Sequence, residues 1–291
     1  RVRARGSANG YEVSGDKLAL TRAQGASMRP TSFSIAGQPQ AGQTPERGSA
    51  SANLIELEPL AQLAAFLPSP APLRKLLAEL APRGNLLDFN FGWSGPLEEA
   101  QSYGVKSRFS DVAMNAWHGV PGFAGLSGRV DAGSRGGRAY LAARNTEIDL
   151  PKIFPQPRIG LDELNGQIDW ERSLSGAVDV RIASLAFSNS HLAGSASGTY
   201  AWHEDAGPGT IDLSARLSRA DGSQVVRYLP LASITGARTR AWLADAIVSG
   251  QASDVALRLK GDLRDFPFAD PSSGEFQVGA HVSNGTLQVG P

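Results

Sequence analysis

The sequence predicts a mainly β protein in which a long, twisted antiparallel sheet carries short helical inserts. Apolar residues alternate with polar residues along many segments, as expected for strands with one dry face and one wet face. These segments recur at intervals of roughly 8–12 residues, a spacing typical of antiparallel strands that pair in chain order. Glycine-rich and proline-rich turns separate them, as at Gly207-Pro208-Gly209.

The clearest strands lie in the second half of the chain. Ile168 and Trp170 share one face of a predicted strand, whereas Asp169 lies on the other face. The alternation continues through residues 178–187, 211–217, 255–259 and 276–282. The dipeptide Asn284-Gly285 predicts a hairpin turn that leads into one more strand.

The first half of the chain contains shorter signals of the same kind. Residues 10–35 predict two paired strands with a turn at Gly15-Asp16, and residues 87–93 predict a half-buried strand. Residues 36–53 consist mainly of Gly, Gln, Pro, Ser and Ala, with almost no large apolar side chain. Because burial cannot offset the ordering entropy of such a stretch, we expect a flexible loop there.

Short helices interrupt the strands in two places. Leucines at helical spacing predict helices over residues 59–67 and 69–80, with Pro68 between them and Gly84 as the C-terminal stop. A capping-box pattern at residues 221–224, Asp-Gly-Ser-Gln, predicts a third short helix that leads to Tyr228. A fourth helix, capped by Thr239 and ending at Gly250, has its apolar face at Trp242, Leu243, Ala246 and Ile247.

Most of this helical region occurs twice. The tripeptides at 66–68, Phe-Leu-Pro, and 228–230, Tyr-Leu-Pro, each precede a helix, a glycine and a strand. From Arg74 and Arg240 onward the two copies keep one offset (240 − 74 = 166), and Asp88 and Asp254 are in register. A repeat of this length indicates modular construction. We interpret the repeated residues as a connector between sheet modules.

The repeat divides the chain into six predicted parts. These are strands that end a preceding module (1–35), a flexible loop (36–53), a helical connector (54–84), a β module (85–221), a second helical connector (222–250) and the start of a further β module (251–291).

Composition excludes several classes of function. The 28 basic and 28 acidic side chains cancel, so no basic surface predicts nucleic-acid binding. The chain has no cysteine, and its four histidines are not at metal-ligand spacing, so we expect no metal and no cofactor. No nucleophile motif or paired acid and base is recognisable, and we expect no enzymatic activity. No apolar run is long enough to span a membrane, and the start at Arg1-Val2-Arg3 predicts a piece of a longer protein.

The apolar faces of ten or more strands need a cover, and four short helices are too few to supply it. The sheet could close on itself as a sandwich or barrel, or it could form a trough filled by something apolar. Periodicity alone favours neither arrangement.

Several stretches resemble a known family. They are Tyr228-Leu229-Pro230 ahead of a helix, residues 261–268 (Gly-Asp-Leu-Arg-Asp-Phe-Pro-Phe), the strand that starts Gly274-Glu275-Phe276, and the block 188–230 with its Gly-Thr-Tyr and Gly-Pro-Gly-Thr-Ile-Asp-Leu segments. In these residues the chain is similar to the YhdP group of the AsmA-like family of Gram-negative bacteria. The resemblance is most specific over residues 160–290.

The resemblance implies a central segment of a long periplasmic protein that is anchored in the inner membrane by a helix outside this chain. It implies a repeating β-groove, apolar inside, that conducts phospholipid between the inner and outer membranes without catalysis. The expected partners are phospholipid acyl chains, membranes bound through other parts of the protein, and envelope proteins. Our lipid-groove candidates are apolar strand residues: Val178, Val180, Ile182, Leu213, Leu217, Val255, Leu257, Leu259, Phe276, Val278 and Val282.

Two other functions stay compatible with the sequence. One is a non-transporting periplasmic scaffold that serves envelope assembly. The other is a carbohydrate-binding β domain, which five tryptophans would suit. For each groove candidate the alternative is an ordinary core residue.

Overall fold

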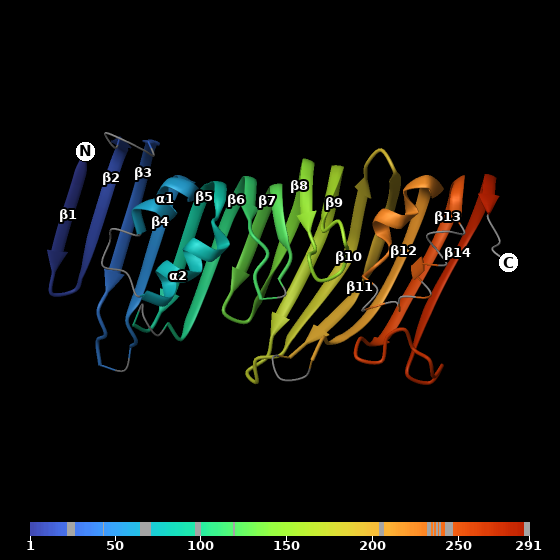
Figure 1. Cartoon of the computed structure of the whole chain (residues 1–291). Helices are drawn as coiled ribbons and strands as arrows, with labels where there is room; N and C mark the ends of the chain where they lie inside the picture. Colours follow the sequence, from blue (N-terminus) through green and yellow to red (C-terminus); the bar gives the residue numbers. More distant parts are fainter. Residues whose placement is uncertain are drawn as a thin grey trace. The chain divides into compact units, whose positions relative to one another are not determined.

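A computed structural model describes residues 1–21, 27–42, 44–64, 71–96, 100–118, 120–203, 207–231, 234, 236, 238, 240–241 and 247–287. Within these residues the protein is mainly β, with fourteen strands hydrogen-bonded in chain order from β1 to β14 (Figure 1). The order ends at β1 and β14, and no pairing joins these two strands in the described part of the chain. The predicted antiparallel sheet is therefore confirmed, and the alternative of a closed sandwich or barrel is wrong.

The strands of the first half are β1 (Val2–Ser7), β2 (Gly10–Thr21), β3 (Ser27–Gln38), β4 (Arg47–Glu56), β5 (Arg83–Ser94), β6 (Ser102–Met114) and β7 (Gly122–Gly133). Those of the second half are β8 (Gly136–Asp149), β9 (Arg158–Arg172), β10 (Val178–Ser188), β11 (Leu192–Trp202), β12 (Thr210–Asp221), β13 (Ile247–Asp262) and β14 (Gly274–Leu287). The helices in the described residues include α1 (Leu57–Ala64), α2 (Ala71–Leu80) and the 3-10 helix η2 (Gly222–Tyr228).

The chain divides into two compact units. Unit 1 comprises Arg1–Trp117 and Phe123–Ala139, and unit 2 comprises His118–Gly122 and Tyr140–Pro291. Unit 1 contains α1 and α2 with β1 to β7, and unit 2 contains η2 with β9 to β14 and most of β8. Each unit is described by itself below.

The flexible loop predicted over residues 36–53 is wrong for most of that range. Residues 36–38 belong to β3 and residues 47–53 to β4. The small side chains of β4 are direct partners of large ones on β5, since Gly48 pairs with Trp93 and Ala50 with Phe91. Neighbouring aromatic rings therefore supply the apolar contacts that this stretch lacks on its own.

Two predicted turns are also wrong. Gly15-Asp16 lies inside β2, where Lys17 has a φ of 48°, and Asn284 lies inside β14 with a φ of 51°. In both places a left-handed residue is accommodated within a long strand instead of reversing it, as at a β-bulge. At Asn284 the residue preference indicated the left-handed conformation correctly, whereas at both sites the pairing with neighbouring strands decided the direction of the chain.

The first two helices lie where the sequence predicts them, but α1 begins two residues earlier than predicted and α2 begins two residues later. Helix α2 ends at Leu80, and Gly84 lies in β5. Asp221 caps η2 by accepting a hydrogen bond from the backbone N–H of Ser223, as the capping pattern predicts. Gly250 lies within β13, so the prediction that it ends a helix is wrong. Pro68, Thr239 and the predicted apolar face at Trp242, Leu243 and Ala246 lie outside the described residues.

The two copies of the repeat share backbone conformations in the strand that follows the helices. Asp88 in β5 and Asp254 in β13 have φ values of 50° and 52°. The flanking glycines also have positive φ in both copies, at 84 and 95 and at 250 and 261. Aspartate is among the residues that tolerate the left-handed conformation, and such a residue in a strand increases its bend and twist. The repeated aspartate thus marks a repeated bend of the sheet.

Candidate functional site: the apolar face of the sheet

Cross-strand pairing in unit 2 places apolar side chains in rows on one side of the sheet. Directly opposed residues of an antiparallel pair point to the same side, so the register identifies each row. One row runs from Ile182 through Gly198, Leu213 and Leu259 to Phe276. The next runs from Leu185 through Ala196, Ala215 and Leu257 to Val278. We call the side that carries these rows the apolar face.

All eleven sequence-predicted groove candidates lie on the apolar face. Val180 pairs with Trp170 and Tyr200, Leu217 pairs with Gly194 and Val255, and Val178 pairs with Trp202. Val282 belongs to a row through Ala252 and Ala220, where the bulge at Asp254 shifts the alternation by one residue. The register thus brings together on one surface residues that are up to 104 positions apart (282 − 178 = 104).

Much of this face is accessible to solvent. Phe276, Val278 and Val282 are 46%, 58% and 61% exposed, and among the candidates only Val255 is buried. The whole chain exposes 18171 Å². A compact globular protein of its mass, 30.6 kDa, would expose about 12,000 Å². In the part of the chain that the structure describes, no second layer of strands covers these rows.

Unit 1 has an apolar face of the same kind, which our sequence reasoning did not assign to the site. One row runs through Val13, Ile35, Ala50, Phe91 and Val105. A neighbouring row contains Tyr11, Gly37, Gly48, Trp93 and Tyr103. The alternation of residues 87–93 predicted β5. Strands β3 and β4 could not be assigned to the apolar face from the sequence, because many of their residues on that face are small.

Aromatic rings in unit 1 lie across glycines of the adjacent strand. A Cβ atom placed on Gly48 would collide with the ring of Trp93, and one placed on Gly15 would collide with the ring of Phe33. The ring centroids of Phe91 and Trp93 are 5.6 Å apart, a separation typical of stacked aromatic pairs. The indole Nε1 of Trp93 is buried and has no hydrogen-bond partner in the described part of the chain. The glycines therefore let the rings lie flat against the sheet.

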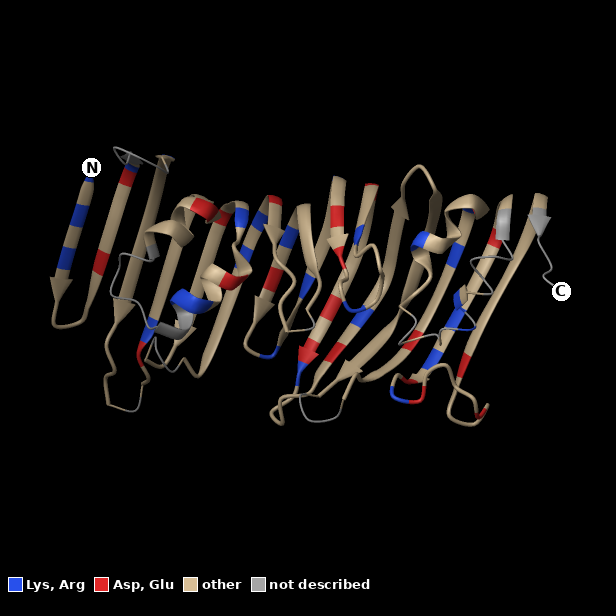
Figure 2. Cartoon of the chain, in the orientation of Figure 1, with Lys and Arg blue, Asp and Glu red and all other residues tan. Residues whose placement is uncertain are grey.

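The opposite side of the unit 2 sheet is charged and solvated. Arg258 forms an ion pair with Asp212 and lies 3.7 Å from a carboxylate oxygen of Glu275, and Lys260 lies 3.9 Å from Asp212. The hydrogen bond from Arg258 and the charges of Arg258 and Lys260 lower the pKa of Asp212 below its ordinary value. Figure 2 shows basic and acidic residues distributed along the strands. The sheet is therefore amphipathic, with one wet side and one apolar side.

A strap runs along one edge of unit 2. It comprises η2 and the following residues 229–231. The hydroxyl group of Tyr228 accepts a hydrogen bond from Asn189 Nδ2 (3.0 Å) and lies 3.1 Å from His191 Nδ1, both in the β10–β11 turn. The backbone N–H of Leu231 donates to the carbonyl of Ile153 in the β8–β9 connection. We call this side of unit 2 the strap edge.

Side chains near the strap edge are well packed. Asn189 is buried, its Oδ1 accepts from the N–H groups of His191 and Leu192, and its Nδ2 also donates to the carbonyl of Gly160. Leu164, on the apolar face beside this edge, is 3% exposed. The strap edge is thus closed by hydrogen-bonded backbone and by packed apolar residues.

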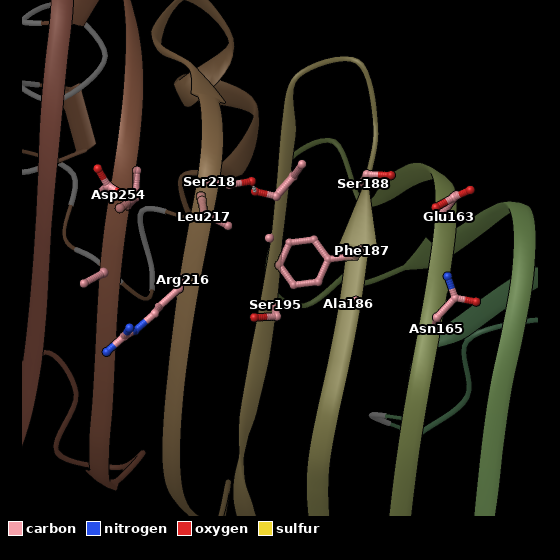
Figure 3. Close-up of a pocket in the computed structure, with 14 residues that line it drawn as sticks. Glu163, Asn165, Ala186, Phe187, Ser188, Ser195, Arg216, Leu217, Ser218 and Asp254 are labelled. Carbon is pink, nitrogen blue, oxygen red and sulfur yellow. Dashed lines mark hydrogen bonds between the residues drawn. The ribbon is translucent and has the colours of Figure 1, made fainter.

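Two hollows of the described residues include positions of the apolar face. The larger of the two, about 570 Å³, is lined by Phe187, Leu217 and Val255 together with small and polar residues of β9 to β13 (Figure 3). Asn165, Ala186, Ser195, Arg216 and Ala256 form a single cross-strand row there, on the charged side of the sheet. The smaller hollow, about 370 Å³, lies in unit 1. Asp254 lines the first and Asp88 the second, so the hollows accompany the two bends at the repeated aspartate.

The described residues include neither a metal-binding cluster nor a membrane-spanning helix. Among the residues that the structure describes, no group of three or more His, Cys, Asp or Glu side chains could hold a metal ion. The described helices also include none with the length and apolar character needed to cross a membrane.

Comparisons with known proteins identify the family of this chain. A sequence profile of the family described as "YhdP protein" matches residues 1–291. A curated relative, the Intermembrane phospholipid transporter YhdP of Escherichia coli (strain K12), is 26% identical over 200 residues, which cover 67% of this chain. The same stretch covers only 15% of the relative, so the chain corresponds to a small part of that protein. No solved structure matches the chain. Because the family profile matches over its full length, the chain belongs to the YhdP family.

Proposed function

We propose that this chain is a non-enzymatic segment of a phospholipid conduit between the inner and outer membranes. In this proposal the sheet curls so that its apolar face lines a groove, and acyl chains occupy that groove. The observation that carries the proposal is the set of solvent-accessible apolar rows across β9 to β14. The name of the relative, an intermembrane phospholipid transporter, supports the same ligand class.

The mechanism requires no reactive group. Moving an acyl chain from water onto an apolar surface is favourable by about 0.8 kcal/mol for each buried methylene. Side chains such as Leu213, Leu259 and Phe276 offer similar apolar contacts from strand to strand, so a lipid that moves between adjacent positions meets no large change in free energy. The charged side, with Arg258, keeps the outside of the conduit wet.

The proposal also includes a place in the cell. We infer that the chain lies in the periplasm, and that other parts of the full-length protein anchor it in the inner membrane and contact the outer membrane or envelope proteins. An apolar groove is useful between two membranes, because the aqueous space between them is the barrier to lipid movement. In this proposal the segment supplies part of the lipid path, and other parts of the protein make the contacts with the two membranes.

Mass spectrometry of lipids that co-purify with the chain tests the proposal. We expect phospholipid in stoichiometric amounts, and its loss when the apolar face receives a charge at Val278. A charge at Gln277, the neighbouring position on the wet side, is the matched control. A folded chain that is free of lipid after extraction under mild conditions, and that does not take up added phospholipid, would exclude a conduit.

A further inference from the structure

The two long edges of the unit 2 sheet differ in chemistry. The strap edge is closed by residues 222–231 and by the hydrogen bonds of Asn189. The other edge is formed by the β9–β10, β11–β12 and β13–β14 turns, and we call it the aromatic edge. The last positions of the apolar face before this edge carry Trp170, Tyr200 and Trp202.

The aromatic edge also carries a basic residue on the apolar face. Arg172 follows Ile168 and Trp170 at the same alternation on β9, and it pairs with Val178, which in turn pairs with Trp202. Arg172 is exposed, and its guanidinium makes no hydrogen bond or ion pair with any residue that the structure describes. Trp202 is 38% exposed. Among the described residues this cation has no partner, and it lies at the end of an apolar surface, two residues after Trp170 and in register with Trp202 two strands away.

Aromatic rings also lie at the β13–β14 turn of this edge. Phe268 is buried, and its ring occupies the space above Gly261 and Gly274. The ring of Phe266 lies 5.3 Å from that of Phe276, centroid to centroid. Aromatic residues of this kind gather where apolar and polar regions of a lipid meet, because a large ring tolerates both environments.

We propose that a phospholipid on unit 2 lies across the strands, with its phosphate at Arg172 beside Trp170 and Trp202 and its acyl chains directed towards the strap edge. This inference rests on the proposed function and adds an orientation to it. An anionic phosphate complements the free guanidinium, which can bind it through two parallel hydrogen bonds. The strap edge offers the packed Leu164 and the hydrogen-bonded Asn189 and Tyr228, so it suits hydrocarbon. Its unbonded donor Arg227 Nε is buried and so is not accessible to a headgroup.

Unit 1 has the same asymmetry within itself. Helices α1 and α2 connect the end of β4 to the start of β5 at one edge, and the backbone N–H of Asn115, after β6, donates to the carbonyl of Leu80 there. The opposite edge carries Tyr11, Trp93 and Tyr103 in one row. Both units thus place helical segments at one edge and amphipathic rings at the other.

The absence of cysteine makes an orientation test straightforward. Ser175 and Ser190 are exposed and lie in the turns at the two ends of β10, roughly 30 Å or more apart for an eleven-residue strand. Single variants Ser175→Cys and Ser190→Cys of the full 291-residue chain would be labelled with a small fluorophore. Each would then be mixed with phosphatidylcholine that carries a nitroxide quencher either on its headgroup or at the end of an acyl chain.

We expect the headgroup quencher to act more strongly at position 175 and the acyl-chain quencher more strongly at position 190. The reverse order, or equal quenching at both positions, overturns the orientation while leaving a lipid conduit intact. No quenching by either lipid at either position overturns the conduit and the orientation together.

The role of Arg172 has a separate readout. Arg172→Gln should weaken binding of phosphatidylglycerol about threefold, the effect of losing an exposed ion pair, and should leave binding of uncharged diacylglycerol unchanged. Arg172→Lys should retain most of the affinity for phosphatidylglycerol. Arg181→Gln, on the charged side in register with Asp169, is the matched control and should change neither affinity. Equal losses for both lipids would assign Arg172 a structural role, and no loss for either would exclude it from the headgroup site.

Discussion

Val278→Asp distinguishes a lipid-lining residue from a core residue more sharply than any other single change. Val278 pairs directly with Leu257 and is 58% exposed, so less than half of its side chain is buried by protein. Fully burying a valine contributes about 1.5–3 kcal/mol, and removing this partial burial should therefore cost only about 1 kcal/mol of folding free energy. The chain should stay folded.

The same substitution should impair lipid binding much more strongly. An acyl chain that passes Val278 would lose contact for about two methylenes, or about 1.6 kcal/mol, before any cost of desolvating the new carboxylate. That loss alone lowers affinity more than tenfold, because about 1.4 kcal/mol is a factor of ten.

Binding of a fluorescent phospholipid and urea unfolding should be measured on the same preparations. Gln277→Asp serves as the control, since Gln277 pairs with Arg258 on the charged side and should tolerate an acidic side chain. If Val278→Asp unfolds the chain, or if both variants bind lipid like the parent, the assignment of the apolar face to lipid is wrong.

Three further predictions concern the sheet that presents this face. Gly48→Ala should destabilise the chain by about 1–3 kcal/mol in urea unfolding, since the new Cβ collides with the Trp93 ring. Asp254→Val should cost about 1–3 kcal/mol, because a β-branched residue does not tolerate a φ of 52°, whereas Asp254→Gly should be close to neutral. Asp212→Asn should destabilise the chain in a pH-dependent way, because the hydrogen bond from Arg258 lowers the pKa of Asp212. The difference in stability between the parent and this variant should be fully present above pH 3.8 and should vanish as the pH falls through the lowered pKa.

Each of these predictions has an outcome that would contradict it. Gly6→Ala, at a strand glycine with open space around it, should have little effect, and an equal loss there would remove the argument from the Trp93 ring. Equal destabilisation by Gly and Val at position 254 would show that the side chain of the aspartate, and not its backbone conformation, matters. A melting-temperature difference between the parent and Asp212→Asn that persists at low pH would exclude the ion pair as its cause.

The sequence predicted the type of structure and much of the site. Alternation of apolar and polar residues identified β9, β10 and β12 to β14, because side chains of a strand point to the same side at every second residue. It also placed the eleven groove candidates on one side of their strands. The same reasoning failed over residues 36–53, where Gly48 and Ala50 are too small to show an apolar side. Their apolar contacts come from Trp93 and Phe91 on another strand.

Turn and cap signals show the same limit. Asp221 determines its own cap, because both partners of the hydrogen bond lie within two residues. Asn284 predicts a left-handed conformation correctly but not a hairpin, because pairing between β13 and β14 carries the chain straight through it. A local signal therefore fixes a dihedral angle, whereas long-range pairing decides whether the chain turns.

By itself, the sequence determined that the chain is an amphipathic antiparallel sheet in which a helical segment occurs twice. It also determined that the chain has no cysteine and no excess of either charge. Only the tertiary structure showed that the rows face solvent, that Asp88 and Asp254 mark matching bends, and that the strap and Arg172 occupy opposite edges of unit 2. The physical reason is that alternation reports which side a residue faces within its own strand. The register between strands decides which residues share a surface, and the path of distant segments decides what covers it.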